Sequence, residues 1–122
     1  MILIDTTVIS ELVRIDPAPY VLAVFYLQAV ETLYMSAITV AELRFGLATM
    51  PEGKRRSLYQ DRLESEVLPA FKGRVLPFDL DASQAYAALM ARAKAGGQAI
   101  GKADGYIAAT ATVQGLTVAT RD

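Results

Sequence analysis

The side chains that could do chemistry in this sequence are carboxylates. The chain of 122 residues has 13 Asp and Glu, 12 Lys and Arg, and no histidine or cysteine. Without His and Cys, the usual structural zinc sites, cysteine nucleophiles, serine–histidine triads and histidine general bases are excluded. Any reaction must therefore use carboxylates, hydroxyls, Lys, Arg, Tyr or the backbone. Four acids stand beside expected element boundaries: Asp5, Glu42, Asp104 and Asp122.

The elements that would position these acids alternate between strands and helices. Short apolar runs predict strands at 2–4, 33–35, 74–76 and 116–120. Apolar periodicity and helix-breaking residues predict helices at 8–14, 20–31, 39–49, 54–71, 84–94 and 102–113. Because helices separate all these strands, the strands cannot pair as hairpins. We therefore expect a parallel sheet in an α/β fold, with helices on both faces.

Polar residues at two boundaries predict where individual helices begin. The stretch from Thr39 to Glu42 matches the capping-box pattern, which predicts that the third helix begins there. Asp81 or Ser83 is expected to cap the helix at 84–94.

The four acids are predicted to meet at one edge of the sheet. Asp5 follows the first strand and Asp122 follows the last, while Glu42 and Asp104 lie in the first turns of helices. In an open parallel sheet, the ligand site lies beyond the carboxyl ends of the strands. Clustered carboxylates repel one another, and bound divalent cations relieve that repulsion. Oxygen ligands alone favour Mg²⁺ or Mn²⁺, and such ions are suited to phosphodiester hydrolysis.

Each acid also has a structural interpretation that the spacing leaves open. Asp5 can cap the first helix, Glu42 can be the return arm of the capping box, and Asp104 can complement a helix dipole. Asp122 is the final residue printed.

Charge and composition narrow the class of protein. The net charge of −1 gives no overall positive field that would indicate nucleic-acid binding. If a metal site binds four of the 13 acidic side chains, however, the 12 basic residues exceed the other nine acids by three, and the surface can still attract a polyanion. Absence of cysteine fits a reducing compartment, and we expect a cytoplasmic protein with no signal peptide. The longest stretch without charge, 17–30, has 14 residues and is predicted to be a buried helix and not a membrane span.

Basic residues supply further candidates. Arg44 lies close to Glu42 in the sequence and can bind a substrate phosphate or pair with a carboxylate of the pocket. The cluster at 54–56, with Arg62, is interpreted as a solvated helix face. The segment at 96–103 resembles a P-loop, but it follows a helix and lacks the final hydroxyl, which argues against nucleotide binding.

Four stretches of the sequence, with 73–78, resemble conserved blocks of PIN-domain toxins. They are most similar to the FitB-like branch of the VapC ribonucleases of bacterial toxin–antitoxin pairs, and the match extends in order over essentially the whole chain. The blocks are 1–6, 36–43, 103–111 and 117–122.

This resemblance implies a single PIN-like domain over 1–122, a three-layer α/β/α fold with a short parallel sheet of about four strands. It implies an endoribonuclease that depends on Mg²⁺ or Mn²⁺, with Thr120 as an auxiliary hydroxyl near the metal. It also implies a homodimer, inhibited by an antitoxin that binds DNA and lays a segment across the active-site groove. The acidic ligands implied by the family are Asp5, Glu42, Asp104 and Asp122.

The sequence departs from the family pattern in two places. Thr7 stands where the family usually has Asn, which alters a polar contact behind the first acid. The family also continues beyond the fourth acid, which leaves three alternatives at Asp122: a truncated C-terminal end, a disordered tail or a poorly fixed fourth ligand. The alternative function is a PIN-like binding module without catalysis, which assembles with an antitoxin on operator DNA.

Overall fold

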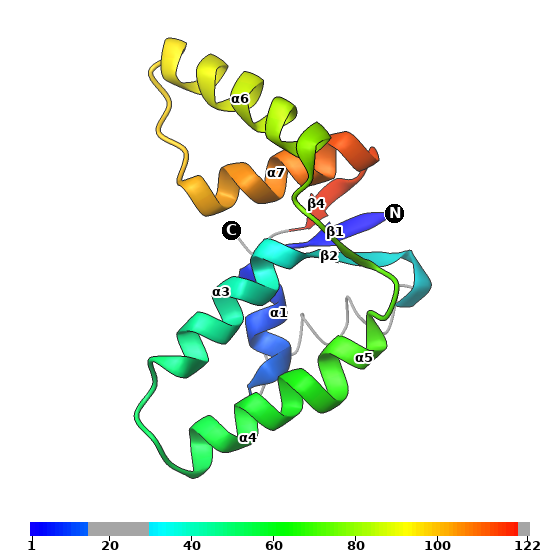
Figure 1. Ribbon diagram of the computed structural model, residues 1–122, viewed down its shortest axis with the longest axis vertical. Coiled ribbons are helices and arrows are strands. Elements are labelled where there is room, and N and C mark those ends of the chain that lie inside the picture. Colours follow the sequence, from blue (N-terminus) through cyan, green and yellow to red (C-terminus); the bar gives the residue numbers. More distant parts are fainter. Residues whose placement is uncertain (15–29, 120–122) are drawn as a thin grey trace.

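The computed structural model describes residues 1–14 and 30–119, and it contains a four-stranded parallel sheet (Figure 1). The strand order is β3-β2-β1-β4, so β1 is central and pairs with both β2 and β4. The strands are β1 (Ile2–Ile4), β2 (Leu33–Ser36), β3 (Val75–Leu76) and β4 (Thr117–Ala119). The predicted parallel sheet is confirmed.

Helices fill the connections between the strands, as the sequence predicts. They are α1 (Thr6–Val13), α3 (Ala37–Ala48), α4 (Lys54–Arg62), α5 (Leu68–Ala70), α6 (Leu80–Ala95) and α7 (Lys102–Gln114). A π-helical stretch, Leu63–Val67, joins α4 to α5, so the predicted helix at 54–71 is nearly continuous. The predicted helix at 20–31 lies outside the described residues except for a 3-10 turn at Val30–Thr32. Thr120 and Asp122 also lie outside them.

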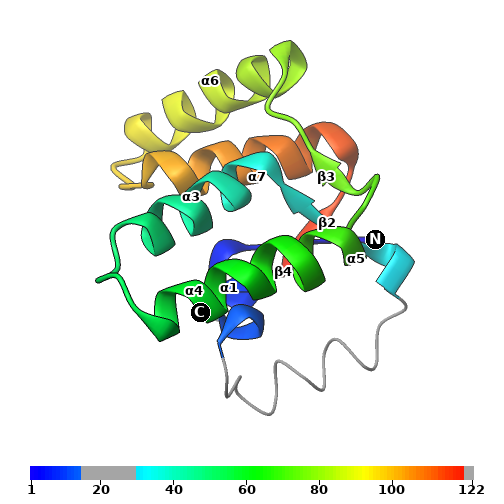
Figure 2. The same ribbon diagram turned by 60° about the horizontal axis from the view of Figure 1, so that its bottom comes forward.

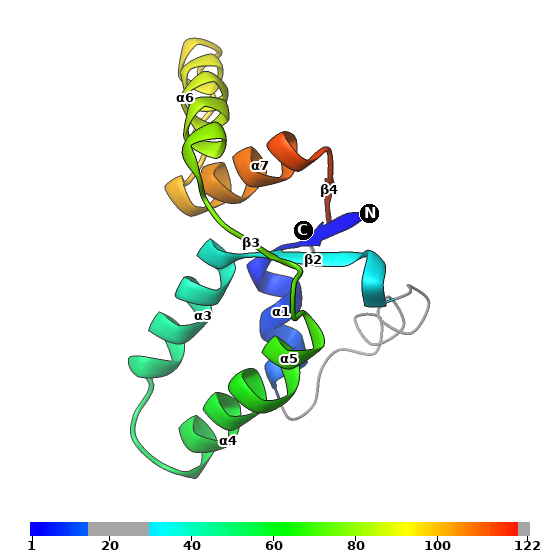
Figure 3. The same cartoon turned by 45° about the vertical axis from the view of Figure 1, so that its right-hand side comes forward.

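The helices form a layer on each face of the sheet. Figures 1 and 3 show α6 and α7 on one face, and α1, α3, α4 and α5 on the other. Successive side chains of a strand point to opposite faces. Accordingly, Leu3 packs in a small cluster with Ile107 and Ala111, whereas Ile4 packs in a larger cluster with Val8. The expected three-layer α/β/α architecture is confirmed.

The layer formed by α1, α3, α4 and α5 is held together by the nearly continuous helix from α4 to α5. Its π-helical stretch contacts α1, and Figure 2 shows this helix lying across α1. Leu63, Val67 and Phe71 are buried there in the same cluster as Val8. Among the described residues, no helix is long and apolar enough to cross a membrane.

Two predicted helix starts are wrong. The N-cap of α3 is Ser36, whose hydroxyl accepts a hydrogen bond from the Ile38 N–H at 3.0 Å, so Thr39 lies inside the helix. The N-cap of α6 is Asp79, whose carboxylate accepts from the Ala82 N–H at 2.9 Å. In both cases the helix begins earlier than predicted, because a polar residue closer to the preceding strand caps it.

Candidate metal centre

Asp5 lies at the carboxyl end of the central strand. It caps α1, and its Oδ1 accepts hydrogen bonds from the Val8 N–H at 3.2 Å and the Thr7 hydroxyl at 2.8 Å. Its own N–H donates to the Ala119 carbonyl at 3.1 Å, which places β4 directly beside it. Asp5 Oδ2 forms no hydrogen bond within the described residues. Capping therefore occupies one oxygen and leaves the other available to a cation.

Thr7 contributes to the same arrangement. Its hydroxyl reaches Asp5, so the residue that replaces the family's usual Asn still supplies a polar contact to the first acid. Thr7 is exposed, and water competes for this contact.

Glu42 lies in the second turn of α3, which begins where β2 ends. The Thr6 hydroxyl donates to Glu42 Oε1 at 2.5 Å, so the side chain is turned toward α1 and the end of β1. The capping-box interpretation of Glu42 is wrong, because α3 begins at Ala37. Glu42 Oε2 forms no hydrogen bond within the described residues.

Glu42 also lines a cavity of about 260 Å³ between α1, α3 and α4. Thr6, Ser10 and Tyr59 contribute hydroxyl-bearing side chains to its wall, and the remainder is apolar. The Glu42 carboxylate is therefore the one acidic group that the described residues contribute to this mostly apolar cavity wall.

Asp104 lies in the first turn of α7. This helix begins after Gly101 without a side-chain cap, and Asp104 is exposed. A carboxylate at this position is stabilised by the positive end of the helix dipole. Helices α3 and α7 are in contact, and Figures 1 and 3 show that both begin near the end of the sheet at which β2 leads into α3, although they lie on opposite faces.

Within residues 1–14 and 30–119, no three acidic side chains lie close enough together to hold one metal ion. The structure links Asp5 and Glu42 through Thr6, while Asp104 stands apart on α7 and Asp122 is outside the described residues. The predicted cluster of four carboxylates therefore stays a prediction.

The donor chemistry of this edge fits a hard divalent cation. Mg²⁺ is usually held by one or two carboxylates, with waters and substrate phosphates completing the shell. Asp5 and Glu42 supply two such carboxylates, each with one oxygen that accepts no hydrogen bond from the described residues.

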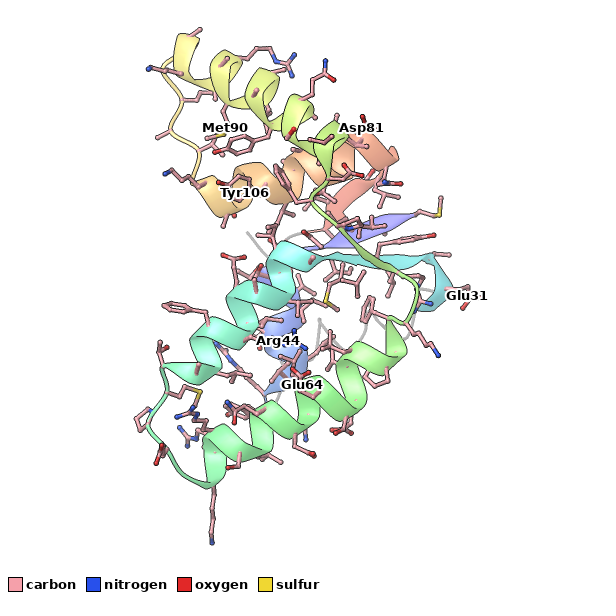
Figure 4. The ribbon with its side chains drawn as sticks, in the orientation of Figure 1. Glu31, Arg44, Glu64, Asp81, Met90 and Tyr106 are labelled. Atoms are coloured by element: carbon pink, nitrogen blue, oxygen red, sulfur yellow. The ribbon has the colours of Figure 1, made fainter. Side chains whose placement is uncertain are left out.

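Arg44 is paired with a carboxylate outside this site. Its Nε and NH2 groups donate to the two carboxylate oxygens of Glu64 at 3.0 and 2.7 Å (Figure 4). These hydrogen bonds raise the pKa of Arg44 and lower that of Glu64. Residues two apart on a helix point to different sides. Arg44 accordingly lines a separate hollow of about 390 Å³ with Val40 and Leu68, away from the wall that Glu42 lines.

Two residues of the basic cluster, Arg56 and Arg62, form hydrogen bonds within the protein. Arg62 donates to the Arg14 carbonyl at 2.7 Å and lies 3.5 Å from Glu66. Arg56 donates to the Met50 carbonyl at 3.4 Å. The P-loop-like segment joins α6 to α7 and follows a helix, as the sequence indicates.

Two threonines that the sequence analysis did not assign to the site are hydrogen-bonded to Glu42 or to each other. Thr6 bonds Glu42, and Thr39 Oγ1 lies 3.2 Å from Thr6 Oγ1. The available signals were the position of Thr6 directly after Asp5 and the spacing of three residues between Thr39 and Glu42, which share one helix face.

Comparisons with known proteins agree with this fold. The family model of the PIN domain matches residues 2–122. The chain is 68% identical to VapC ribonuclease Y4jK of Sinorhizobium fredii and 51% identical to toxin FitB of Neisseria gonorrhoeae. Both matches cover the whole chain, with 87% and 88% of the respective relatives.

Solved structures give the same result. The crystal structure of FitAcB from Neisseria gonorrhoeae has a TM-score of 0.92 and 51% identity, and a structure of FitAB bound to an IR36 DNA fragment has a TM-score of 0.92 and 48% identity. The whole chain is covered in both matches, with 88% and 85% of the respective neighbours. The chain therefore belongs to the PIN-domain family, in the branch that includes the VapC and FitB toxins.

Proposed function

We propose that this protein is an endoribonuclease toxin that uses Mg²⁺ or Mn²⁺ to hydrolyse RNA phosphodiester bonds. The observation that carries the proposal is the hydrogen bond to Glu42 from Thr6, the residue directly after Asp5, beyond the carboxyl ends of β1 and β2. The name of the S. fredii relative, a VapC ribonuclease, supports the reaction class. We expect the protein to act in the cytoplasm.

Asp5 and Glu42 bind the cation in this proposal, and Asp104 and Asp122 complete the acidic site. A bound divalent cation supplies activation of water and neutralisation of charge on the phosphate. The hydrogen bonds to Asp5 Oδ1 and Glu42 Oε1 orient the two carboxylates, so that their other oxygens are available to the cation. Thr120 and Asp122 follow Ala119, whose carbonyl accepts the Asp5 N–H, and this adjacency supports their assignment to the same site.

Arg44 has a different role in the same proposal. The sequence allowed it to bind substrate phosphate or to pair with a carboxylate. In the structure it pairs with Glu64 and lines a hollow separate from the one that Glu42 lines, so an RNA phosphate that reaches Arg44 competes with Glu64 for the guanidinium. Both side chains are about half exposed, so that exchange costs little.

A cleavage assay with single-stranded RNA tests the reaction. We expect cleavage with Mn²⁺ and loss of cleavage with a chelator. The cleavage rate should fall by at least about 100-fold when a proposed metal ligand is removed. The variants are Asp5→Asn, Glu42→Gln and Asp104→Asn. Asp81→Asn, an exposed acid on α6, is the matched control and should cleave as the unaltered protein does. Full activity in Asp5→Asn, or cleavage that survives the chelator, would show that the proposal is wrong.

The same fold supports a second function, assembly with an antitoxin on operator DNA. The FitAB structure bound to a DNA fragment motivates it, and the mostly apolar cavity between α1, α3 and α4 suits an apolar segment of such a partner. We also propose that the protein forms a homodimer. Sedimentation of the protein alone tests for the homodimer, and sedimentation with its antitoxin tests for the complex. A binding module without catalysis would assemble with the antitoxin but leave RNA intact at every Mn²⁺ concentration.

A further inference from the structure

The hydroxyl groups of Thr39 and Thr6 form a hydrogen-bonded chain that ends at the Glu42 carboxylate. Thr6 Oγ1 lies 2.5 Å from Glu42 Oε1 and 3.2 Å from Thr39 Oγ1. A hydroxyl carries one proton, and a carboxylate only accepts. The Thr6 proton therefore goes to Glu42, and the Thr39 hydroxyl donates to the Thr6 oxygen. Thr39 is fully buried, so water does not replace its hydroxyl in this chain.

The sequence positions of these residues connect two elements at the site. Thr6 is the first residue of α1 and is joined by a peptide bond to Asp5, while Thr39 and Glu42 are three residues apart on α3. Hydroxyl groups thus tie the start of α1 to the face of α3 that carries Glu42. The position of Glu42 is thereby fixed relative to Asp5.

Fixing a glutamate matters because its side chain is long. Ordering a Glu side chain costs rotamer entropy. A free Glu42 would pay this cost when it bound a cation, whereas a Glu42 already held by Thr6 has paid it on folding. Partners of ligand side chains, which do not touch the metal, commonly change metal affinity by about 10–100-fold.

We propose that Thr6 is a positioning residue, whose hydroxyl holds Glu42 beside Asp5 and prepares the pair for a divalent cation. The inference rests on the proposed function, since it assumes that Glu42 binds the metal. Thr6 acts through Glu42 alone, and Thr39 supports it from the interior.

Calorimetric titration with Mn²⁺ tests this role without any activity measurement. We expect Thr6→Val, which keeps the shape and removes the donor, to bind Mn²⁺ about tenfold more weakly than the unaltered protein. Thr6→Ser restores the hydroxyl and should restore the affinity. Thr112→Val is the matched control, because Thr112 is exposed on α7 and its hydroxyl bonds only the Ala108 carbonyl among the described residues. Its affinity should not change.

A double-mutant cycle separates positioning from a general effect on the fold. In a Glu42→Gln background, Thr6→Val should cause no further loss of Mn²⁺ affinity, because the carboxylate that it positions is absent. A full additional loss would overturn the inference. If Thr6→Val does not fold, Thr39→Val provides the test, with a smaller loss expected and an unchanged affinity counting against the inference.

The outcomes also distinguish this inference from the proposed function. If the unaltered protein binds no Mn²⁺ and cleaves no RNA, both are wrong. If it binds Mn²⁺ and Glu42→Gln weakens the binding, but Thr6→Val keeps the full affinity, only the role of Thr6 is wrong.

Discussion

Gly105 of α7 lies against Met90 of α6, so closely that a Cβ atom on Gly105 would be 2.8 Å from the Met90 sulfur. The same atom would be 3.0 Å from a ring carbon of Tyr86, which stacks on Tyr106 with ring centroids 4.5 Å apart. Figure 4 shows Met90 and Tyr106 between the two helices. This contact sets how closely α6 packs on the helix that carries Asp104.

We expect Gly105→Ala to lower the free energy of unfolding by about 1 kcal/mol. Overpacking costs about 1–3 kcal/mol, and the better helix propensity of alanine offsets about 1 kcal/mol. Gly46→Ala in α3 is the matched control, because nothing lies within 4 Å of its Cβ position, and it should stabilise by about 0.5–1 kcal/mol. Urea unfolding measures both. Equal effects of the two substitutions would show that α6 moves away from α7 without cost.

Asp79→Ala should destabilise the protein by about 1 kcal/mol, because it removes the side chain that caps α6. Asp81→Ala leaves the cap intact and should change the free energy of unfolding by less than about 0.5 kcal/mol. Thermal unfolding of both variants decides between Asp79 and Asp81 as the capping residue.

Glu64→Gln should cost about 0.5 kcal/mol near neutral pH, because the exposed pair with Arg44 is worth little. The pKa of Glu64 is lowered in the folded protein by the hydrogen bond from Arg44. Its contribution is therefore fully present above the ordinary carboxylate pKa of about 4.3, and is lost as the pH falls from that value through the lowered pKa of the folded protein. Urea unfolding of both proteins at about pH 7 and about pH 3 should show a smaller difference at the lower pH. A difference that grows in acid would contradict this sign.

Addition of Mn²⁺ should stabilise the folded protein. At about 100 times its Kd, the ion contributes about 2.7 kcal/mol, because it binds the folded state and not the unfolded one. Differential scanning calorimetry should show a higher Tm that a chelator reverses. Asp5→Asn should lose the shift, whereas Asp61→Asn, an exposed acid on α4, should keep it.

The parallel direction of the strands could be predicted because it follows from simple patterns. Each strand is a short apolar run, and each connection is long and helical, so only a parallel arrangement remains. The alternation of Leu3 and Ile4 between two layers follows from the same geometry.

The helix starts could not be predicted with the same accuracy, because several short polar side chains compete within a few residues. Ser36 caps α3 and leaves Thr39 to bond Thr6 instead. The choice depends on where β2 ends, and β2 extends one residue beyond the predicted strand. At α6 the capping residue is Asp79 and not Asp81, although β3 ends at Leu76 as predicted.

Contacts between distant parts of the chain left no local signal. The partner of Arg44 is Glu64, 20 residues later, and nothing near Arg44 in the sequence identifies it. The bond from Thr6 to Glu42 spans 36 residues and depends on how α1 and α3 pack together. The candidate acids were found because their types are chemically distinctive, but the hydroxyls that hold them were not.

The central position of β1 has a consequence for the order in which the molecule forms during synthesis. Ile4 pairs with Ala119, and the Asp5 N–H needs the Ala119 carbonyl. The first strand to leave the ribosome thus waits for a neighbour that emerges more than 110 residues later. Until then the edge of β1 that pairs with β4 is open beside Asp5, and this corner of the candidate site is completed only after residue 119 has been made.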